Sequence, residues 1–327
     1  MIWLIRWLMG RQFTALALLQ GHTVVISGCD TGFGHETTLN LLALGINVCA
    51  GCYTDKGIQD LSEIASKCKG ILLALKLDVT NQESVADFYS RASEFSPNGI
   101  YALINNAGVA SALPFEILSF ESHQRIMDVN YFGSLRMMRA FTPLLRKFSQ
   151  KQKGRPNRIH PRIITIGSIA GRVPIPLLSA YSASKHAVRV LTEIARVELA
   201  AFGIKAIVIE PAFAATPIVL TDQSENHNAE FEEAPEEAKI AYGTPTIQER
   251  REKLRKVGTD PLIMKSRQVV NVIVNAVRIA SPADRYVVGL AGYVIIALKA
   301  ILPWWIVDWI FLSENGKMDF GQNAHLY

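Results

Sequence analysis

Cysteine is scarce in this chain of 327 residues: it has four, all in the first quarter. So few thiols exclude the disulfide framework of a small secreted protein. Cys49 and Cys52 have the spacing of a metal or redox pair, but no second Cys/His pair follows. They also lie in the apolar run Ile46–Cys52, which is typical of a strand, where side chains three residues apart point to opposite faces. We therefore predict buried thiols and no metal site.

A long uncharged apolar run is also missing. Residues 1–20 are apolar but are broken by Arg6 and Arg11, and no signal-peptide cleavage site is clear. The apolar stretch Tyr286–Leu312 carries a lysine, a proline and an aspartate. Its longest uncharged part, Tyr286–Leu298, is shorter than the roughly 20 residues of a spanning helix. Tryptophans in both segments favour contact with a membrane surface, and a lid over a substrate pocket is the alternative for the C-terminal stretch.

Acidic residues are absent from the segment Arg146–Arg162, which contains seven lysines and arginines and supplies much of the net charge of +5. A nucleic-acid site would need basic residues along one face with aromatic residues between them. Here the basic residues lie in a polar stretch that is rich in glycine, proline and asparagine. We therefore expect no nucleic-acid partner, and interpret the segment as a solvated connection that could also meet an anionic membrane surface.

The sequence does contain short apolar runs, rich in valine and isoleucine, that alternate with longer segments of helical periodicity. The apolar runs are His22–Ser27, Ile46–Cys52, Ile71–Leu77, Tyr101–Ile104, Ile163–Gly167 and Ile204–Ile209. The helical segments include Ser84–Glu94, Phe120–Phe148 and Leu178–Phe202. This pattern predicts an α/β protein with a doubly wound parallel sheet that is buried on both faces. We expect one such domain at 21–285, between an apolar N-terminal segment, 1–20, and an apolar extension, 286–327.

A glycine-rich segment, Ser27-Gly28-Cys29-Asp30-Thr31-Gly32-Phe33-Gly34, closes the first apolar run and opens a helix. Glycines at such a junction allow a tight turn and a close approach to a pyrophosphate, and the helix N-terminus supplies unpaired N–H groups. The position between the first strand and the first helix of a βαβ unit indicates a Rossmann-like dinucleotide site.

Tyr181 and Lys185 lie four residues apart, and Tyr181 comes thirteen residues after Ser168. On a helix the tyrosine and the lysine share one face. A fixed positive charge favours the phenolate and lowers the pKa of a tyrosine. This pair is therefore a candidate acid and base, although the spacing alone also occurs by chance on surface helices.

Taken together and in this order, these motifs resemble the short-chain dehydrogenase/reductase family over about residues 23–280. The spacing of the glycines, three residues and then one, belongs to that resemblance. So do the remaining motifs, which are Asp78-Val79, Asn105-Asn106-Ala107-Gly108, Asn130 and Glu210-Pro211-Ala212. The glycine-rich segment and the passage Asp284–Gly289 are similar to the retinol and hydroxysteroid dehydrogenase branch. The mitochondrial 3-hydroxybutyrate dehydrogenases are close relatives of that branch.

The resemblance implies roles for particular residues. Tyr181 would be the general base in alcohol oxidation, and Lys185 would lower its pKa and hold the nicotinamide ribose. Ser168 would stabilise charge on the substrate oxygen, and Asn130 would hold a water linked to Lys185. The implied cofactor contacts are Ser27, Gly28, Asp30, Thr31, Gly32, Phe33, Gly34, Tyr53, Asp78, Val79, Asn105, Asn106, Ala107, Gly108, Pro211 and Thr216, together with Tyr181 and Lys185.

NAD is favoured over NADP as the cofactor. No lysine or arginine lies in the glycine-rich segment or directly after the second strand, at residues 53–55. Asp55 is the acid nearest to the place of an NAD-selecting carboxylate, and Lys56 is the nearest base. One residue departs from the family pattern: Ala212 stands where the family usually has a glycine, which permits positive φ and close approach to the nicotinamide.

The segments expected at the pocket rim, Val173–Leu178 and Phe213–Leu220, are apolar. They favour a lipophilic alcohol, or the matching ketone or aldehyde, of retinoid or steroid type. A 3-hydroxybutyrate-type substrate would need a buried cation, and Arg172 and His186 are the nearby candidates. A non-catalytic cofactor- or lipid-binding protein on this fold is a further alternative, and a nucleotide-sugar epimerase ranks last. We expect membrane association at the endoplasmic reticulum, or alternatively in the mitochondrion, and leave open a homo-oligomer.

Overall fold

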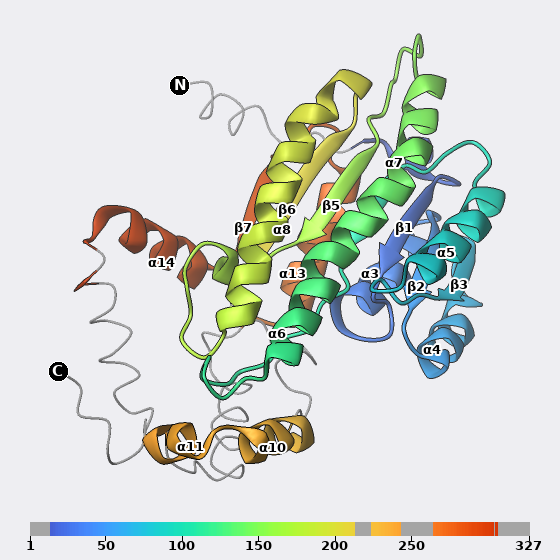
Figure 1. Cartoon of the computed structure of the whole chain (residues 1–327). Coiled ribbons are helices and arrows are strands. Elements are labelled where there is room, and N and C mark those ends of the chain that lie inside the picture. The colour runs from blue at the N-terminus through green and yellow to red at the C-terminus, as the bar shows by residue number, and fades with distance from the viewer. Residues whose placement is uncertain (1–13, 213–223, 243–263, 304, 307–327) are drawn as a thin grey trace.

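The computed structural model describes residues 14–212, 224–242, 264–303 and 305–306, and shows one sheet with helices on both faces (Figure 1). The strands are β1 Thr23–Ser27, β2 Asn47–Cys52, β3 Leu72–Lys76, β4 Ala102–Asn105, β5 Arg162–Ile166, β6 Lys205–Pro211 and β7 Arg285–Val288. The helices are α2 Leu16–Leu19, α3 Gly32–Ala43, α4 Asp55–Ala65, α5 Gln82–Phe95, α6 Phe120–Met127, α7 Ser134–Lys151, α8 Ser179–Glu198, α10 Ser224–Glu233, α11 Glu236–Tyr242, α13 Ser266–Arg278 and α14 Leu290–Ile301.

The strands lie in the order β3-β2-β1-β4-β5-β6-β7, and every neighbouring pair is parallel. The prediction of a doubly wound parallel sheet is confirmed. Because all strands run the same way, their carboxyl ends meet at one edge, which we call the carboxyl edge. The direction of winding reverses between β1 and β4, and a crevice at such a reversal is where ligands bind in open α/β sheets.

The central parts of the strands are apolar because helices cover both faces of the sheet. One layer, with α3, α4 and α13, packs against Ile26, Cys52 and Ile104. The other layer, with α5, α7 and α8, packs against alternate strand residues that include Cys49 and Leu103. Cys49 and Cys52 are free, buried and on opposite faces, as predicted, and burial raises the pKa of each thiol to about 12.

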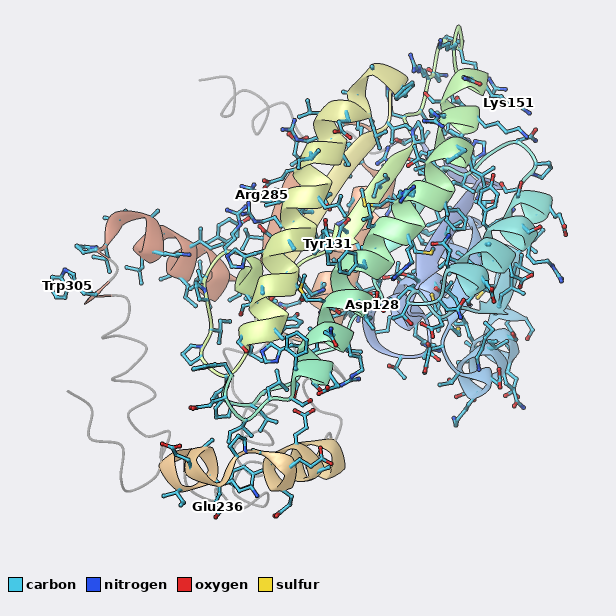
Figure 2. The ribbon with its side chains drawn as sticks, viewed as in Figure 1. Asp128, Tyr131, Lys151, Glu236, Arg285 and Trp305 are labelled. Carbon is cyan, nitrogen blue, oxygen red and sulfur yellow. The ribbon has the colours of Figure 1, made fainter. Side chains whose placement is uncertain are left out.

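The long helical segment predicted at 120–148 is interrupted. A π-helical turn, Asp128–Gly133, joins α6 to α7, and Figure 2 labels Asp128 and Tyr131 on it. An additional residue in a helical turn shifts the faces of the two flanking helices, and such turns often occur at functional sites. Hydrophobic periodicity could not reveal this turn, because the apolar residues keep nearly the same spacing through it.

The seventh strand was not predicted from the sequence. β7 has four residues, begins with the exposed Arg285, and is recognisable only through its pairing with β6. The boundary expected at residue 285 falls at the first residue of this strand, so the sheet extends to Val288. Beyond it, α14 projects from the body of the protein (Figure 1). Within the described ranges, no helix combines the length and apolar character that crossing a membrane requires.

Candidate active site and its relatives

The glycine-rich turn lies between β1 and α3, at the carboxyl edge. Gly28 and Gly32 have φ of +70° and +60°, which favour glycine. A Cβ atom on Gly28 would lie 2.7 Å from the Ala107 Cα, and one on Gly34 would lie 2.2 Å from the Gly28 carbonyl oxygen. The N-cap residue of α3, Thr31, makes no side-chain capping bond, so the first N–H groups of α3 are not bound by it. This cradle fits a dinucleotide pyrophosphate.

Asn106 joins the glycine-rich turn to the end of β4. Its Nδ2 donates to the carbonyl oxygens of Ser27 and Gly28, at 3.0 and 2.8 Å. In return, the Ser27 hydroxyl accepts from the backbone N–H groups of Asn106 and Ala107, both at 3.2 Å. Ser27 and Asn106 therefore shape the cofactor cradle through bonds to its backbone.

Asp30 lies between the glycine-rich turn and the end of β2. Its carboxylate accepts from the N–H groups of Tyr53 and Thr54, at 2.8 and 2.7 Å, and from the Thr54 hydroxyl at 2.7 Å. Asp30 thus ties the glycine-rich turn to the end of β2. The Tyr53 side chain is exposed beside it, while Phe33 packs against the core.

Two more predicted positions follow β3 and end β4. Asp78 accepts from the Thr80 backbone and hydroxyl, and Val79 is buried. Asn105 is 3% exposed, yet neither polar atom of its side-chain amide has a partner. A buried amide without hydrogen bonds is rare in proteins, so the Asn105 side chain at the end of β4 is an exception to the usual pairing of buried polar groups.

The two residues weighed for cofactor choice are each engaged on the surface. Asp55 pairs with Lys76 at 3.0 Å, and Lys56 pairs with Asp60 at 2.6 Å. All four side chains are largely exposed, so these pairs are weak and each charge can exchange its partner.

Ser168, Tyr181 and Lys185 come together at the same edge of the sheet. Ser168 follows β5, and its hydroxyl accepts from the Ala170 N–H at 3.1 Å. Tyr181 and Lys185 lie in the first turns of α8. Lys185 is 5% exposed, and its ammonium donates to the Ile166 carbonyl at 2.9 Å and lies 5.6 Å from the centre of the Tyr181 ring.

Burial controls the ionisation of this pair. It raises the pKa of Tyr181, and a hydrogen bond with Ser168 opposes that shift without reversing it. Burial lowers the pKa of Lys185 to about 8. The pKa of Tyr181 lies above its ordinary value because the loss of hydration outweighs the hydrogen bond with Ser168, and the lowering of this pKa by Lys185 stays a prediction.

Asn130 lies on the π-helical turn and is 1% exposed. Its side chain accepts from the Val109 N–H at 2.8 Å and donates to the Val109 carbonyl and the Ser184 hydroxyl, both at 2.9 Å. A Cβ atom on Gly108 would lie 3.3 Å from the Asn130 Oδ1 and 3.5 Å from the Lys185 Nζ. Gly108 thus leaves the space between Asn130 and Lys185 free of a side chain.

Ala212 fits without strain at the place where the family has a glycine. Among the described non-glycine residues, only Leu177 has a positive φ. The Ala212 N–H donates to the Val288 carbonyl at 2.9 Å, and Cβ atoms on Gly289 and Gly292 would each lie 3.3 Å from its methyl group. The methyl group therefore lies beside the start of α14. Thr216 and the rim segment 213–220 lie outside the described residues.

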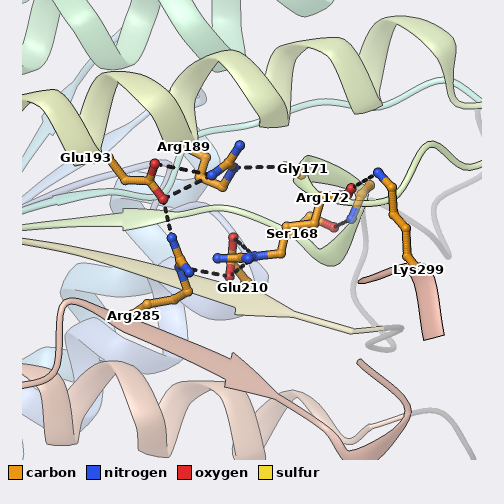
Figure 3. A network of polar contacts seen from close by, with 9 residues as sticks. Ser168, Gly171, Arg172, Arg189, Glu193, Glu210, Arg285 and Lys299 are labelled. Atoms are coloured by element: carbon orange, nitrogen blue, oxygen red, sulfur yellow. Dashed lines mark hydrogen bonds and ion pairs between the residues drawn. The ribbon is translucent and has the colours of Figure 1, made fainter. Parts of the chain in front are cut away.

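Sequence analysis missed one ion pair in this region. Glu210, buried at the end of β6, accepts from the Nε of Arg172, which follows Ser168 by four residues (Figure 3). Both residues were noted, Glu210 as part of a motif and Arg172 as a candidate cation. A carboxylate next to a proline at the end of an apolar strand is the signal that could have drawn attention to Glu210.

The chain is similar to several known dehydrogenases. The chain is 32% identical over 305 residues to human 17-beta-hydroxysteroid dehydrogenase type 2, in an alignment that covers 92% of this chain and 74% of that protein. It is 29% identical to human retinol dehydrogenase 16 (94% and 92% covered) and 30% identical to the mitochondrial D-beta-hydroxybutyrate dehydrogenase of Rattus norvegicus (84% and 79%). A short chain dehydrogenase from Burkholderia cenocepacia J2315, solved in complex with NADP, superposes with a TM-score of 0.63 at 27% identity, covering 86% of this chain and 94% of that one.

Residues 22–227 match the short chain dehydrogenase family, and this range contains β1 to β6, the glycine-rich turn and the Ser168, Tyr181 and Lys185 cluster. The glycine-rich turn, Ser168, Tyr181 and Lys185 follow one another within this range in the order that the resemblance implies. The chain belongs to the short-chain dehydrogenase family and is an NAD(P)-dependent oxidoreductase of alcohols and the corresponding carbonyl compounds.

Proposed function

We propose that Tyr181, Ser168 and Lys185 carry out the proton chemistry of this oxidoreductase. The observation that supports this most directly is their convergence at the carboxyl edge, next to the glycine-rich turn. Ser168 holds the oxygen of the alcohol or carbonyl group and stabilises the negative charge that develops on it. Tyr181 gives its proton to that oxygen in reduction and takes one from it in oxidation.

The raised pKa of Tyr181 keeps its phenol protonated at neutral pH, which suits the acid. Oxidation needs the phenolate, and the neighbouring Lys185 ammonium favours it. With a pKa of about 8, Lys185 itself can lose a proton close to working pH. Asn130 lies across the space at Gly108 from Lys185 and is bonded to the Val109 backbone. From there it would hold the water that links Lys185 to solvent.

Several of the remaining predicted contacts form the cofactor cradle. Gly28, Gly32 and Gly34 would hold the pyrophosphate, and Lys185 would hold the nicotinamide ribose. The nicotinamide supplies the hydride chemistry, and the protein supplies position and electrostatic field. Asp78 and Val79 would contact the adenine, while Asp30 and Asn106 hold the cradle in shape. NAD is the favoured form, because no lysine or arginine lies in the glycine-rich segment or at residues 53–55.

The substrate is a lipophilic alcohol, or its ketone or aldehyde, of steroid or retinoid type. Arg172, one candidate cation for a hydroxy acid, is neutralised by Glu210. The other, His186, is held by the Ser182 carbonyl at 2.9 Å. The relatives include both hydroxysteroid and hydroxybutyrate dehydrogenases, so the neutralised Arg172 is the observation that favours the uncharged substrate.

Replacing Tyr181 by phenylalanine tests the assignment. Turnover should fall by about 10³-fold or more, the upper range for loss of a general acid or base, while NADH binding, followed by fluorescence, stays within about threefold. Tyr89→Phe is the matched control, because Tyr89 packs against Phe141 away from the site. The compounds assayed for turnover are retinols, hydroxysteroids and 3-hydroxybutyrate. Activity retained in Tyr181→Phe would overturn the assignment, and cofactor binding without turnover by the wild type would favour a binding protein.

Membrane association, at the endoplasmic reticulum or alternatively the mitochondrion, is part of the same proposal. Leu290, Val294, Leu298 and Ile301 form one apolar stripe along α14, with exposed fractions between 39% and 81%. Trp305, beyond that helix in Figure 2, is 61% exposed. Such a stripe with a tryptophan at its end fits the boundary of a lipid bilayer.

Replacing Val294, Leu298 and Ile301 by glutamine should shift the protein from the carbonate-washed membrane fraction to the supernatant. Ile64 and Ile71, exposed on the β3 side of the molecule, provide a control pair for the same replacement. If the α14 variant stays in the membrane fraction with the wild type, the anchoring belongs to residues 1–20. If both are in the supernatant, the proposed membrane association is contradicted. Fractionation against marker proteins of the two organelles decides the location.

A homo-oligomer is supported by a second apolar stripe. Val190, Ile194 and Val197 lie on one side of α8, with exposed fractions of 43%, 50% and 64%. Light scattering after gel filtration should give a mass above that of one chain, and Ile194→Glu should reduce it to that mass. A monomeric wild type would contradict this part of the proposal.

A further inference from the structure

Glu210 and Arg172 form a charged pair that lies between the two loops of the reacting centre. The Glu210 side chain is completely buried, and Arg172 is 19% exposed. The Arg172 Nε lies 2.8 and 2.7 Å from the two carboxylate oxygens, and the Arg285 Nε lies 3.7 Å from one of them. A Cβ atom on Gly167, next to Ser168, would lie 3.5 Å from the Glu210 Cγ. The carboxylate therefore lies directly beside the strand end that presents Ser168.

The loop after Ser168 is held at Gly171 and at Arg172. Gly171 accepts from the Arg189 Nε at 3.0 Å, and the Arg172 carbonyl accepts from Lys299 of α14 (Figure 3). There is no room beside Gly171, because a Cβ atom there would lie 2.6 Å from the Lys185 carbonyl oxygen. The loop thus lies against the backbone of α8 at the catalytic lysine, and a shift of Arg172 would move Ser168 relative to Lys185.

The other end of the pair leads to the nicotinamide side of the site. Pro211 and Ala212 follow Glu210 directly, and the Ala212 N–H bonds to the Val288 carbonyl. Burying a carboxylate and a guanidinium together costs desolvation that well-packed apolar side chains would avoid, so stability alone does not explain such a pair. Hydride transfer, in contrast, loses about 10²-fold in rate for a misplacement near 1 Å.

We propose that Glu210 is a positioning residue for hydride transfer: through Arg172 it fixes the Ser168 loop relative to the Pro211–Ala212 turn. The inference rests on the proposed function, since it requires Ser168 to hold the reacting oxygen. Glu210 touches neither substrate nor cofactor, and it acts through the two backbone segments.

Glu210→Gln and Arg172→Lys test the pair in the full-length protein. Each should lower kcat, calculated per cofactor-binding site, by about 10- to 100-fold. The KM for the alcohol and the Kd for NADH should stay within about threefold of the wild-type values. Arg162→Lys is the matched control: Arg162 is also a buried arginine but lies at the other end of β5. It should lower the melting temperature and leave kcat per site unchanged. A Glu210→Gln enzyme with lower stability but the kcat of the wild type would overturn the proposal.

The double variant Arg172→Met, Glu210→Met separates positioning from folding. Removing both charges leaves no buried charge unpaired, so stability should return toward that of the wild type while kcat stays low. Recovery of kcat in the double variant would overturn the proposal. Hydrogen exchange gives a readout that does not depend on turnover: Glu210→Gln should speed exchange at both 168–172 and 212, and unchanged exchange there would overturn it. A wild type without turnover would instead contradict the proposed function.

Discussion

The pKa values of Lys185 and Tyr181 are set mainly by the burial of each side chain. The ammonium donates to the Ile166 carbonyl at 2.9 Å, and Lys185 is only 5% exposed. A buried amine loses hydration when it is charged, which is why its pKa falls to about 8. The same loss of hydration favours the neutral phenol of Tyr181. The resting site therefore tends toward a protonated tyrosine and a lysine that titrates near working pH.

This shift makes the stability of the protein depend on pH. A lysine with a pKa near 8 when folded and about 10.4 when unfolded binds fewer protons in the folded state between these values. Its contribution to stability therefore rises with pH in that window. Between pH 8 and 10, the free energy of unfolding of the wild type should gain about 2 kcal/mol relative to Lys185→Met. Urea unfolding of both proteins at pH 7, 8, 9 and 10 measures this difference.

The comparison with Lys185→Met removes other titrations from the result. Burial raises the pKa values of Cys49 and Cys52 to about 12, so their contribution to stability falls as pH rises past the unfolded value of about 8.5. Both proteins share that loss. A stability difference that stays constant from pH 8 to 10 would contradict the lowered lysine pKa.

Helix α13 shows how one element is held to the sheet at the edge away from the active site. Its last carbonyls each have a partner: that of Ala276 accepts from Arg162 at 2.7 Å, that of Val277 from the Tyr101 hydroxyl at 2.9 Å, and that of Arg278 from the Thr14 N–H at 2.8 Å. Arg162 is completely buried and lies over the Tyr101 ring. A buried cation is compatible with this place because helix C-termini carry partial negative charge.

Replacing Arg162 by methionine should lower the free energy of unfolding by about 3 kcal/mol, because it leaves the Ala276 and Ile279 carbonyls buried without their donor. Tyr101→Phe removes one neutral hydrogen bond and should cost about 1 kcal/mol. Urea midpoints with unchanged m-values measure both effects. A loss below about 1 kcal/mol in Arg162→Met would show that solvent reaches these carbonyls.

At the scale of the molecule, stability and chemistry occupy opposite edges of one sheet. Arg162 begins β5 and Ser168 follows its other end, so a single strand connects the anchor of α13 with the Ser168 loop. Charged pairs at the carboxyl edge hold loops around the site, whereas apolar clusters on both faces hold the sheet itself. We therefore expect variants at the two edges to affect different measurements.

Cofactor binding should stabilise the whole fold, since the cradle exists only in the folded chain. At a concentration of about 100 times its Kd, NAD should add about 2.7 kcal/mol and raise the melting temperature by several degrees. NADP at the same concentration should raise it less. Gly28→Ala should lose the shift, because its Cβ atom would lie 2.7 Å from the Ala107 Cα and the backbone φ is +70°. An equal or larger shift with NADP would contradict the preference for NAD.

Much of this architecture follows from the order of residues along the chain. Six strands, the glycine-rich turn and the shared face of Tyr181 and Lys185 could be predicted, because they depend on periodicity, on glycine conformations and on spacing within one helix. β7 could not be predicted, since four residues with an exposed arginine acquire strand character only by pairing with β6. The π-helical turn that carries Asn130 also left no periodic signal.

Contacts between distant segments belong to the fold alone. Asp30 matched a cofactor position in the sequence, but its carboxylate bonds to Tyr53 and Thr54. Arg172 and Glu210 are 38 residues apart, and only the pairing of β5 with β6 brings them within hydrogen-bond distance. Local patterns therefore identify which groups are present, because short-range geometry repeats in every protein. Long-range packing decides which groups meet and how far water is excluded from them, and that exclusion sets their pKa values.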